Sequence, residues 1–109
     1  MTDTEINIAI AKACPTLFIV VRQTVYWRFD HEKYGQVVDA TTDLNAMAEA
    51  EATLNGEQKV QYMRCLCFNA QCHNWEHGSP TIDEMRAVCF ATARQRAEAF
   101  LKVLGLWKD

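Results

Sequence analysis

ATARQRAEAFLKVLGLW, at residues 91–107, decides the fold of this chain, because it predicts a helix with one charge on its apolar face. Its apolar side chains recur with helical spacing, at Ala93, Ala97, Phe100, Val103, Leu104 and Trp107. Arg96 falls among them at 100° per residue. Because an unpaired charge is very unfavourable in a protein core, Arg96 should meet an acidic side chain there.

TDLNAMAEAE, at residues 42–51, supplies that acid. Thr42 or Asp43 can cap a helix here, and its expected inner face is Leu44, Met47, Ala48 and Leu54. Glu51 falls on the same face, so we predict an ion pair between Glu51 and Arg96 that fixes how the two helices pair. The alternative is that this pair lines a pocket and recognises a polar ligand.

Length and composition predict one globular domain spanning residues 1–109. A chain of this size buries about two-thirds of its unfolded surface, and 50% hydrophobic with 23% charged residues is typical of globular proteins. The longest apolar run, residues 17–21, is too short to cross a membrane. Asp3 and Glu5 stand where a secretory signal needs positive charge, so we expect a cytosolic protein with five reduced cysteines.

The net charge of −3 excludes a nucleic-acid binder that relies on overall charge, although a local basic patch survives that argument. The charges are segregated: residues 36–58 hold five acids and no base, and residues 85–108 hold five bases against Glu98. We interpret these segments as solvated helix faces that attract one another. An acidic face that takes a basic partner is the alternative.

The order of elements predicts an α+β fold, a single-domain sandwich in which three or four helices pack on a small antiparallel sheet. Capping-box pairs mark three helix starts: Thr2 with Glu5, Asn55 with Gln58, and Thr92 with Gln95. TLFIVVRQTVYWRF, at residues 16–29, predicts either one long bent strand or two short ones. A turn at residues 30–35, a strand at 36–39 and a loop at 71–80 are expected, and Ile82–Phe90 suits either helix or strand.

Residues 39–54 and 91–107 resemble the phage ABA sandwich domain family of small tailed-phage and prophage proteins. DLNAMAEAE, at residues 43–51, is similar to the family's DLNAMHEAE, and the last helix is similar to ATARQRAEAFLRTLGLW. Ala48 stands where the family often has histidine. The resemblance implies phage origin and a small sheet enclosed by helices, and it implies no established activity.

A cysteine and histidine cluster is the one candidate metal site, with Cys65, Cys67, Cys72, His73 and His77 in the spacing C-x-C-x4-C-H-x3-H. That spacing is not a standard zinc-finger pattern, and a helix through Cys67 would place Cys65 on a different face. We therefore predict free thiols and no bound metal. A zinc-stapled structural domain is the alternative.

The sequence predicts a protein that is not an enzyme and needs no cofactor. Adjacency of Cys72 and His73 does not orient one side chain toward the other. The chain has no glycine-rich phosphate loop, no G-x-S-x-G and no H-E-x-x-H.

Aromatic and basic side chains alternate in the strand region, where Phe18, Tyr26, Trp27, Phe29 and Tyr34 are interleaved with Arg22, Arg28 and Lys33. Strand alternation places Tyr26 and Arg28 on one face and Trp27 on the other. A core row and a solvated row explain this pattern. Aromatics beside arginines also suit protein recognition, or base stacking with phosphate contacts.

We therefore expect non-catalytic binding to a host macromolecule in the bacterial cytoplasm, blocking an antiviral defence such as CRISPR interference. The partner is expected to be a host protein, with Arg22, Tyr26, Arg28, Asp43 and Glu49 as candidate binding residues. No membrane partner is expected. The competing hypothesis is a homo-oligomer that sequesters a nucleotide signal through Arg22, Arg28 or Arg96, and a nucleic acid is an alternative partner for the strand region.

Metal analysis of purified, tag-free protein tests the prediction of free thiols. We expect no stoichiometric zinc, because the cluster lacks a spacing that closes a tetrahedral site. One zinc per chain would contradict this prediction and favour the zinc-stapled domain.

Overall fold

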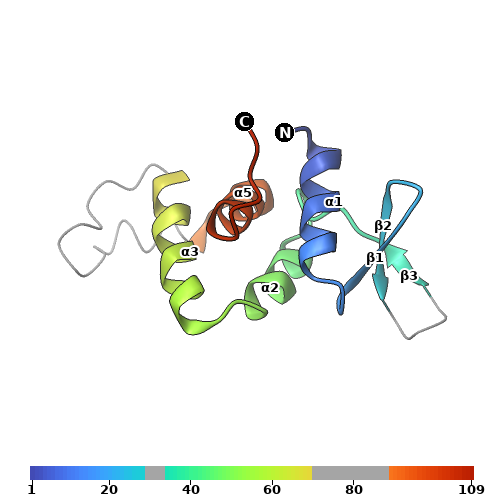
Figure 1. Ribbon diagram of the computed structural model, residues 1–109, viewed down its shortest axis with the longest axis horizontal. Coiled ribbons are helices and arrows are strands. Elements are labelled where there is room, and N and C mark those ends of the chain that lie inside the picture. The colour runs from blue at the N-terminus through green and yellow to red at the C-terminus, as the bar shows by residue number, and fades with distance from the viewer. Residues whose placement is uncertain (29–33, 70–88) are drawn as a thin grey trace.

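The structure is a computed structural model that describes residues 1–28, 34–69 and 89–109. These residues contain four helices and three strands (Figure 1). In chain order they are α1 (Asp3–Ala13), β1 (Phe18–Val21), β2 (Thr24–Arg28), β3 (Tyr34–Val37), α2 (Leu44–Ala52), α3 (Gly56–Asn69) and α5 (Ala93–Val103). The predicted α+β class, a small antiparallel sheet with packed helices, is confirmed.

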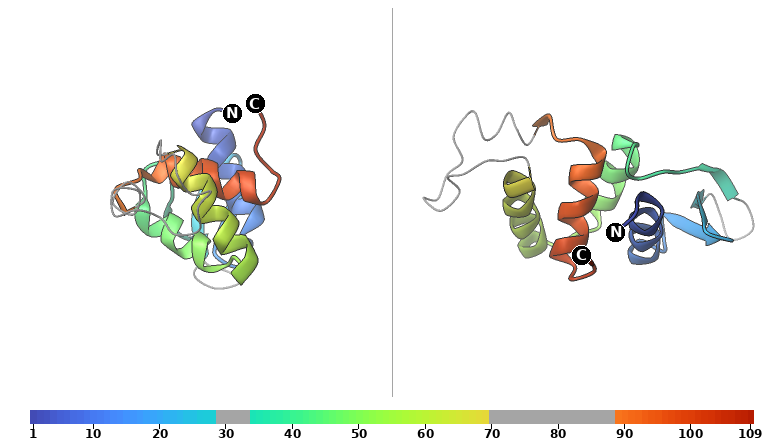
Figure 2. Two further views of the ribbon diagram at one scale, coloured as in Figure 1. Left: turned by 90° about the vertical axis from the view of Figure 1, so that its left-hand side faces the viewer. Right: turned by 90° about the horizontal axis from the view of Figure 1, so that it is seen from above.

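The elements are stacked in layers along an axis 48 Å long. The sheet, in the order β1-β2-β3, forms one end of the molecule, and α1 packs against β1 and β2 (Figures 1 and 2). Helix α5 follows in the middle, where it contacts α1, α2 and α3. The core runs through these layers, from Val25 in the sheet to Leu66 in α3.

Strands β1 and β2 form a hairpin whose two-residue turn is Arg22–Gln23. The register pairs Val21 with Thr24, and Arg22 and Gln23 have φ values of 50° and 68°. Two positive φ values in a two-residue loop are typical of the type I′ turn, whose twist matches the flanking strands. The sequence did not decide between one strand and two in residues 16–29, because this turn lacks the usual asparagine and glycine. The structure has two short strands.

The predicted turn at residues 30–35 falls largely outside the described residues, but its last two positions belong to β3. Gly35 is needed there, because a Cβ atom at this position would lie 2.9 Å from the Cβ atom of Trp27. The pairing of β2 with β3 shifts register between Tyr26 and Arg28. β3 therefore covers Tyr34–Val37 rather than the predicted residues 36–39, and Gly35 allows it to pass Trp27 at close range.

All three predicted capping boxes form. Thr2 and Glu5 exchange hydrogen bonds at the start of α1, as Asn55 and Gln58 do before α3 and Thr92 and Gln95 before α5. Of the two proposed caps for α2, Asp43 is the one used: its Oδ1 accepts from the backbone N–H of Asn45 at 2.9 Å and of Ala46 at 3.1 Å.

Helix α5 ends at Val103, four residues before the predicted end at Trp107. Gly105 has a φ of 72°, and its N–H donates to the carbonyl of Lys102 at 3.1 Å. The N–H of Leu106 donates to the carbonyl of Leu101 at 2.8 Å. This pair of bonds is the Schellman motif, which glycine favours because it accepts a left-handed backbone.

The buried face of α2 agrees with the prediction at Met47 and Leu54, which are buried, and differs from it at Leu44 and Ala48. Leu44 is 54% exposed and Val60 is 51% exposed, and Ala48 is exposed as well. Beside Met47, α2 buries Ala46 and Ala50 in place of Leu44 and Ala48, and α3 buries Tyr62 and Leu66. The reason for α2 is that its small alanines allow close approach to neighbouring elements, which rotates Leu44 and Ala48 toward solvent.

The two ends of the chain lie side by side (Figure 1). The N-terminal amine of Met1 lies 3.3 Å from the carbonyl oxygen of Lys108, and the N–H of Lys108 lies 3.3 Å from Met1 Sδ. Nearby, Arg94 Nε of α5 contacts Asp3 Oδ1 of α1 at 3.1 Å. The first and last described helices are therefore tied together at the surface. None of the described helices is both long and apolar enough to cross a membrane.

Gln23→Gly should stabilise the fold, because the left-handed backbone of Gln23 is sterically unfavourable by about 1–2 kcal/mol for a residue with a Cβ atom. Glycine removes that cost but raises the conformational entropy of the unfolded chain, which opposes the gain by about 0.5–1 kcal/mol. We therefore expect the free energy of unfolding to rise by about 0.5–1 kcal/mol. Urea denaturation measures it. The matched control, Gln61→Gly on the exposed side of α3, should lose about 1 kcal/mol. Equal losses in both variants would rule out the type I′ turn.

Candidate partner-binding surface

The face of the sheet that points away from α1 carries a row of apolar and aromatic side chains across all three strands. Tyr26 lies opposite Ile19 of β1 and opposite Val37 of β3. Ile19 and Tyr26 are half-buried and Val37 is 65% exposed. The inward row is different: Val25 and Phe18 are buried in the core. Trp27 packs against the core, with its ring centroid 4.9 Å from that of Phe18, so the alternation predicted for Tyr26 and Trp27 is confirmed.

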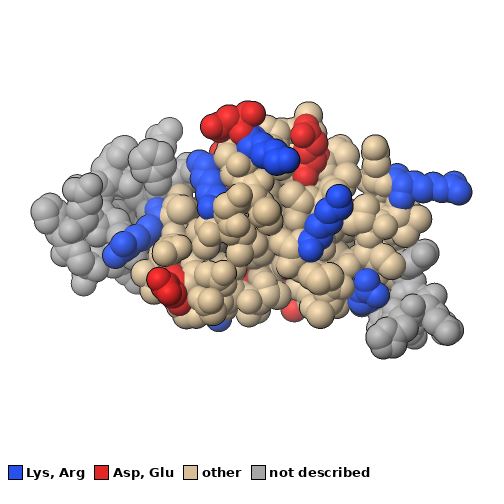
Figure 3. All heavy atoms as spheres, in the orientation of Figure 1, with Lys and Arg blue, Asp and Glu red and all other residues tan. Residues whose placement is uncertain are grey.

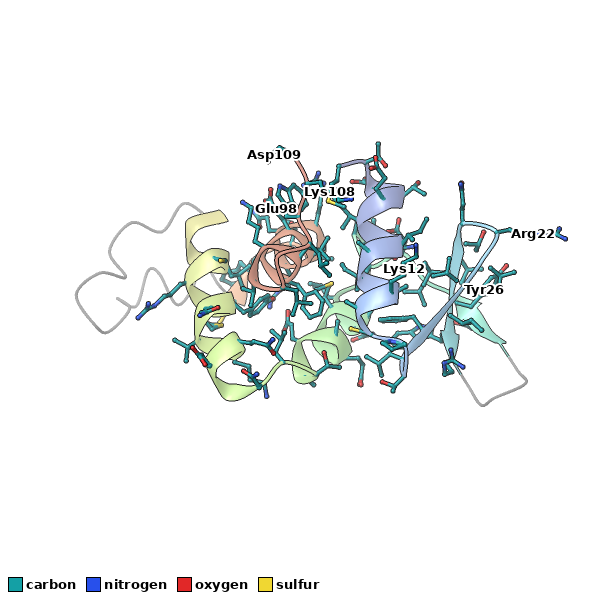
Figure 4. All side chains as sticks on the ribbon, in the orientation of Figure 1. Lys12, Arg22, Tyr26, Glu98, Lys108 and Asp109 are labelled. Atoms are coloured by element: carbon teal, nitrogen blue, oxygen red, sulfur yellow. The ribbon has the colours of Figure 1, made fainter. Side chains whose placement is uncertain are left out.

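Two arginines flank this row. Arg22 is exposed at the tip of the hairpin, and Figure 4 shows its side chain projecting from the end of the molecule. Figure 3 shows that a basic side chain projects at this end. Arg28 ends β2, and its Nε donates to the carbonyl of Pro15 at 2.8 Å. We call this surface the hairpin face and define it by Ile19, Val21, Arg22, Tyr26, Arg28 and Val37.

The other two predicted binding residues lie elsewhere. Asp43 caps α2 with its carboxylate, which is a structural role, and Glu49 is exposed on the same helix. The structure therefore brings Arg22, Tyr26 and Arg28 together on one surface and leaves Asp43 and Glu49 on another. Val37, which the sequence analysis missed, joins the first group because Gly35 lets β3 pair beside Trp27.

Glu51 and Arg96 form the ion pair that their helical positions predict. Arg96 Nη1 lies 3.3 Å from Glu51 Oε1, with 18% and 24% of the two side chains exposed. Arg96 also donates from Nε to the carbonyl of Ala91 at 3.1 Å and from Nη2 to the carbonyl of Cys89 at 3.4 Å. The guanidinium thus joins α2 to the segment that leads into α5.

Tyr62 of α3 completes this network and was not anticipated. The residue is 4% exposed, and its hydroxyl donates to Glu51 Oε1. Burial raises the pKa of Tyr62 well above its ordinary value, the bond to Glu51 and its negative charge raise it further, and Arg96 opposes the shift. The phenol therefore stays protonated as a donor. Its contribution to stability is complete below about pH 10, the pKa of tyrosine in an unfolded chain, and is lost as the pH rises above that.

Glu51 and Tyr62 also line an open groove of about 410 Å³ between α2 and α3, together with Ala48, Ala52, Lys59 and Met63. Its walls are mainly apolar. The arginines that a nucleotide sequestrant would use do not converge on this groove: Arg22 and Arg28 lie on the sheet, and Arg96 is held by Glu51 and two carbonyls. The ion pair therefore stands at the edge of a groove and joins helices.

The candidate metal cluster lies mostly outside the described residues: its only member with a described side chain is Cys65, half-buried on α3. Cys14 is buried, and burial raises the pKa of its thiol although its contact with Thr53 lowers it. Cys89 is exposed. Within the described ranges no group of three or more metal-ligating side chains is assembled. Of Ile82–Phe90, only Cys89 and the exposed Phe90 are described.

No protein-family model, curated protein or solved structure matches this chain significantly.

A mutant series tests the Glu51–Arg96–Tyr62 network by urea denaturation. Glu51→Ala leaves a guanidinium and a buried phenol without their acceptor, and should cost about 2 kcal/mol. The triple variant Glu51→Leu, Arg96→Leu and Tyr62→Phe replaces the whole network by apolar groups and should lie within about 1 kcal/mol of the wild-type chain.

The double variant Glu51→Leu with Arg96→Leu should fall between them, since it keeps the unpaired Tyr62 hydroxyl. If the triple variant is as unstable as Glu51→Ala, the three side chains do not act as one network.

Proposed function

We propose that this protein acts without catalysis, by binding a host protein through the hairpin face. The observation that supports it is the continuous row formed by Ile19, Tyr26 and Val37 across three strands, with exposed Arg22 beside it. Aromatic side chains and arginines are enriched at protein interfaces, and exposed apolar residues gathered on one face mark interaction sites.

The likeness of residues 43–51 and 91–107 to small phage proteins supports a phage accessory role in the host bacterial cytoplasm. A small binding protein of that kind acts by occupying a surface that its target needs, so one copy is required for each target molecule. The target class that follows is a component of an antiviral defence such as CRISPR interference.

Val37→Asp tests the surface and the function together. A charge placed at the centre of a desolvated interface costs binding free energy, so the affinity should fall by about tenfold or more. The measurement is the plating efficiency of a targeted phage on bacteria with active CRISPR interference that express the chain. Wild-type protein should raise it, and Val37→Asp should not.

Val60→Asp is the matched control, because Val60 is exposed to a similar degree but lies on α3. It should keep wild-type activity at equal protein abundance. A photo-crosslinking residue at position 37 should capture a defence component, and one at position 60 should not. Loss of activity in both valine variants would place the interface elsewhere, and a wild-type chain that protects no targeted phage would refute the CRISPR target.

A further inference from the structure

We infer that the hairpin face takes an acidic, extended segment of its partner, which adds a strand along the outer edge of β3. This inference rests on the proposed function, because it names the chemistry of the partner at the same surface. Addition of a peptide strand to a sheet edge gains affinity from main-chain hydrogen bonds and specificity from alternate side chains.

The edge of β3 offers both backbone and side chain to a partner. The order β1-β2-β3 leaves one side of β3 without a neighbour among the described strands. The N–H of Val38 donates to the carbonyl of Val25 at 2.9 Å. Because hydrogen-bonding directions alternate along an antiparallel strand, the peptide groups of Val37 point away from β2. The side chain of Val37 is exposed on the hairpin face, so Val37 presents its donor, its acceptor and an apolar contact.

The charges of the hairpin face favour an acidic partner segment. Arg22 and Arg28 are the only charged residues in the described strands and the turn between β1 and β2. They stand at opposite ends of β2, one in the turn before it and one at its last residue. Opposite charges across an interface raise the rate of encounter and exclude wrong partners. A partner with acids on the same face is therefore favoured over a basic one.

Two other occupants fit this surface less well. A second copy docked face to face would bring arginines against arginines, which is unfavourable. A nucleic acid would need a series of cations along its phosphates, and the described part of this face supplies Arg22 and Arg28 alone.

The positions of the arginines set the spacing of the acids. Arg22 lies in the turn before the five residues of β2 and Arg28 ends that strand, so about 16–20 Å separates them at the rise of a strand. Two acids six residues apart in an added strand share a face and match that separation. The added strand lies about 10 Å from β2, a gap that an arginine and a glutamate side chain span together.

The test uses the full chain and two peptides of defined sequence, acetyl-EVTVTVE-amide and acetyl-KVTVTVK-amide. Fluorescence anisotropy should show the acidic peptide binding at least about tenfold more tightly than the basic one, with affinity that falls as salt is added. Hydrogen exchange of the complex should slow at the amide of Val37. Arg22→Glu should abolish or reverse the preference, whereas Arg64→Glu, at an exposed position on α3, should keep it.

Several results would overturn the inference: equal binding of the two peptides, no binding of either at millimolar concentration, or slowed exchange confined to the helices. Displacement of the acidic peptide by a short single-stranded RNA, or a dimer that Val37→Asp dissociates, would assign the face to nucleic acid or to a second copy. If Val37→Asp abolishes phage protection while the peptides bind equally, the proposed function stands and only the acidic partner is refuted. If the acidic peptide binds but Val37→Asp still protects phage, the hairpin face binds acidic strands and its role in phage protection is refuted.

Discussion

Helix α5 is enclosed by three other helices, and the rest of the structure depends on that enclosure. Ala97, Ala99, Phe100 and Leu101 are completely buried, and the two alanines let neighbouring backbones approach closely. The buried face of such a helix has little access to water, so a polar side chain at that face must find partners within the protein. Arg96 meets that requirement through Glu51 and two carbonyls.

Local signals in the sequence predicted much of this fold because they act over three or four residues. The capping boxes of Thr2, Asn55 and Thr92 each need one polar pair and nothing distant. The ion pair of Glu51 with Arg96 is not local, yet it could be predicted, because two opposite charges on apolar faces have few ways to be satisfied. The strand alternation at Tyr26 and Trp27 is again a local signal, because it depends only on the two-residue period of a strand.

What the sequence could not predict depends on contacts between distant segments. Leu44 looks like a core residue, but alanines on another face of α2 pack inward, and only tertiary packing decides between the two faces. Tyr62 joins the network because α3 lies beside α2 and α5, which no spacing rule predicts. Whether residues 16–29 form one strand or two was left open, because Arg22 and Gln23 avoid the left-handed region unless the flanking strands impose it. Val37 entered the candidate surface for a similar reason, through the close pass of β3 at Trp27.

The contact between the first and last residues has a topological consequence. With Met1 beside Lys108, a short linker could join the two ends without disturbing α1 or α5. The chain could then be opened at an exposed loop, the kind of position where circular permutation is most often tolerated in proteins. The same packing of the helices could therefore be reached from a chain that is synthesised in a different order.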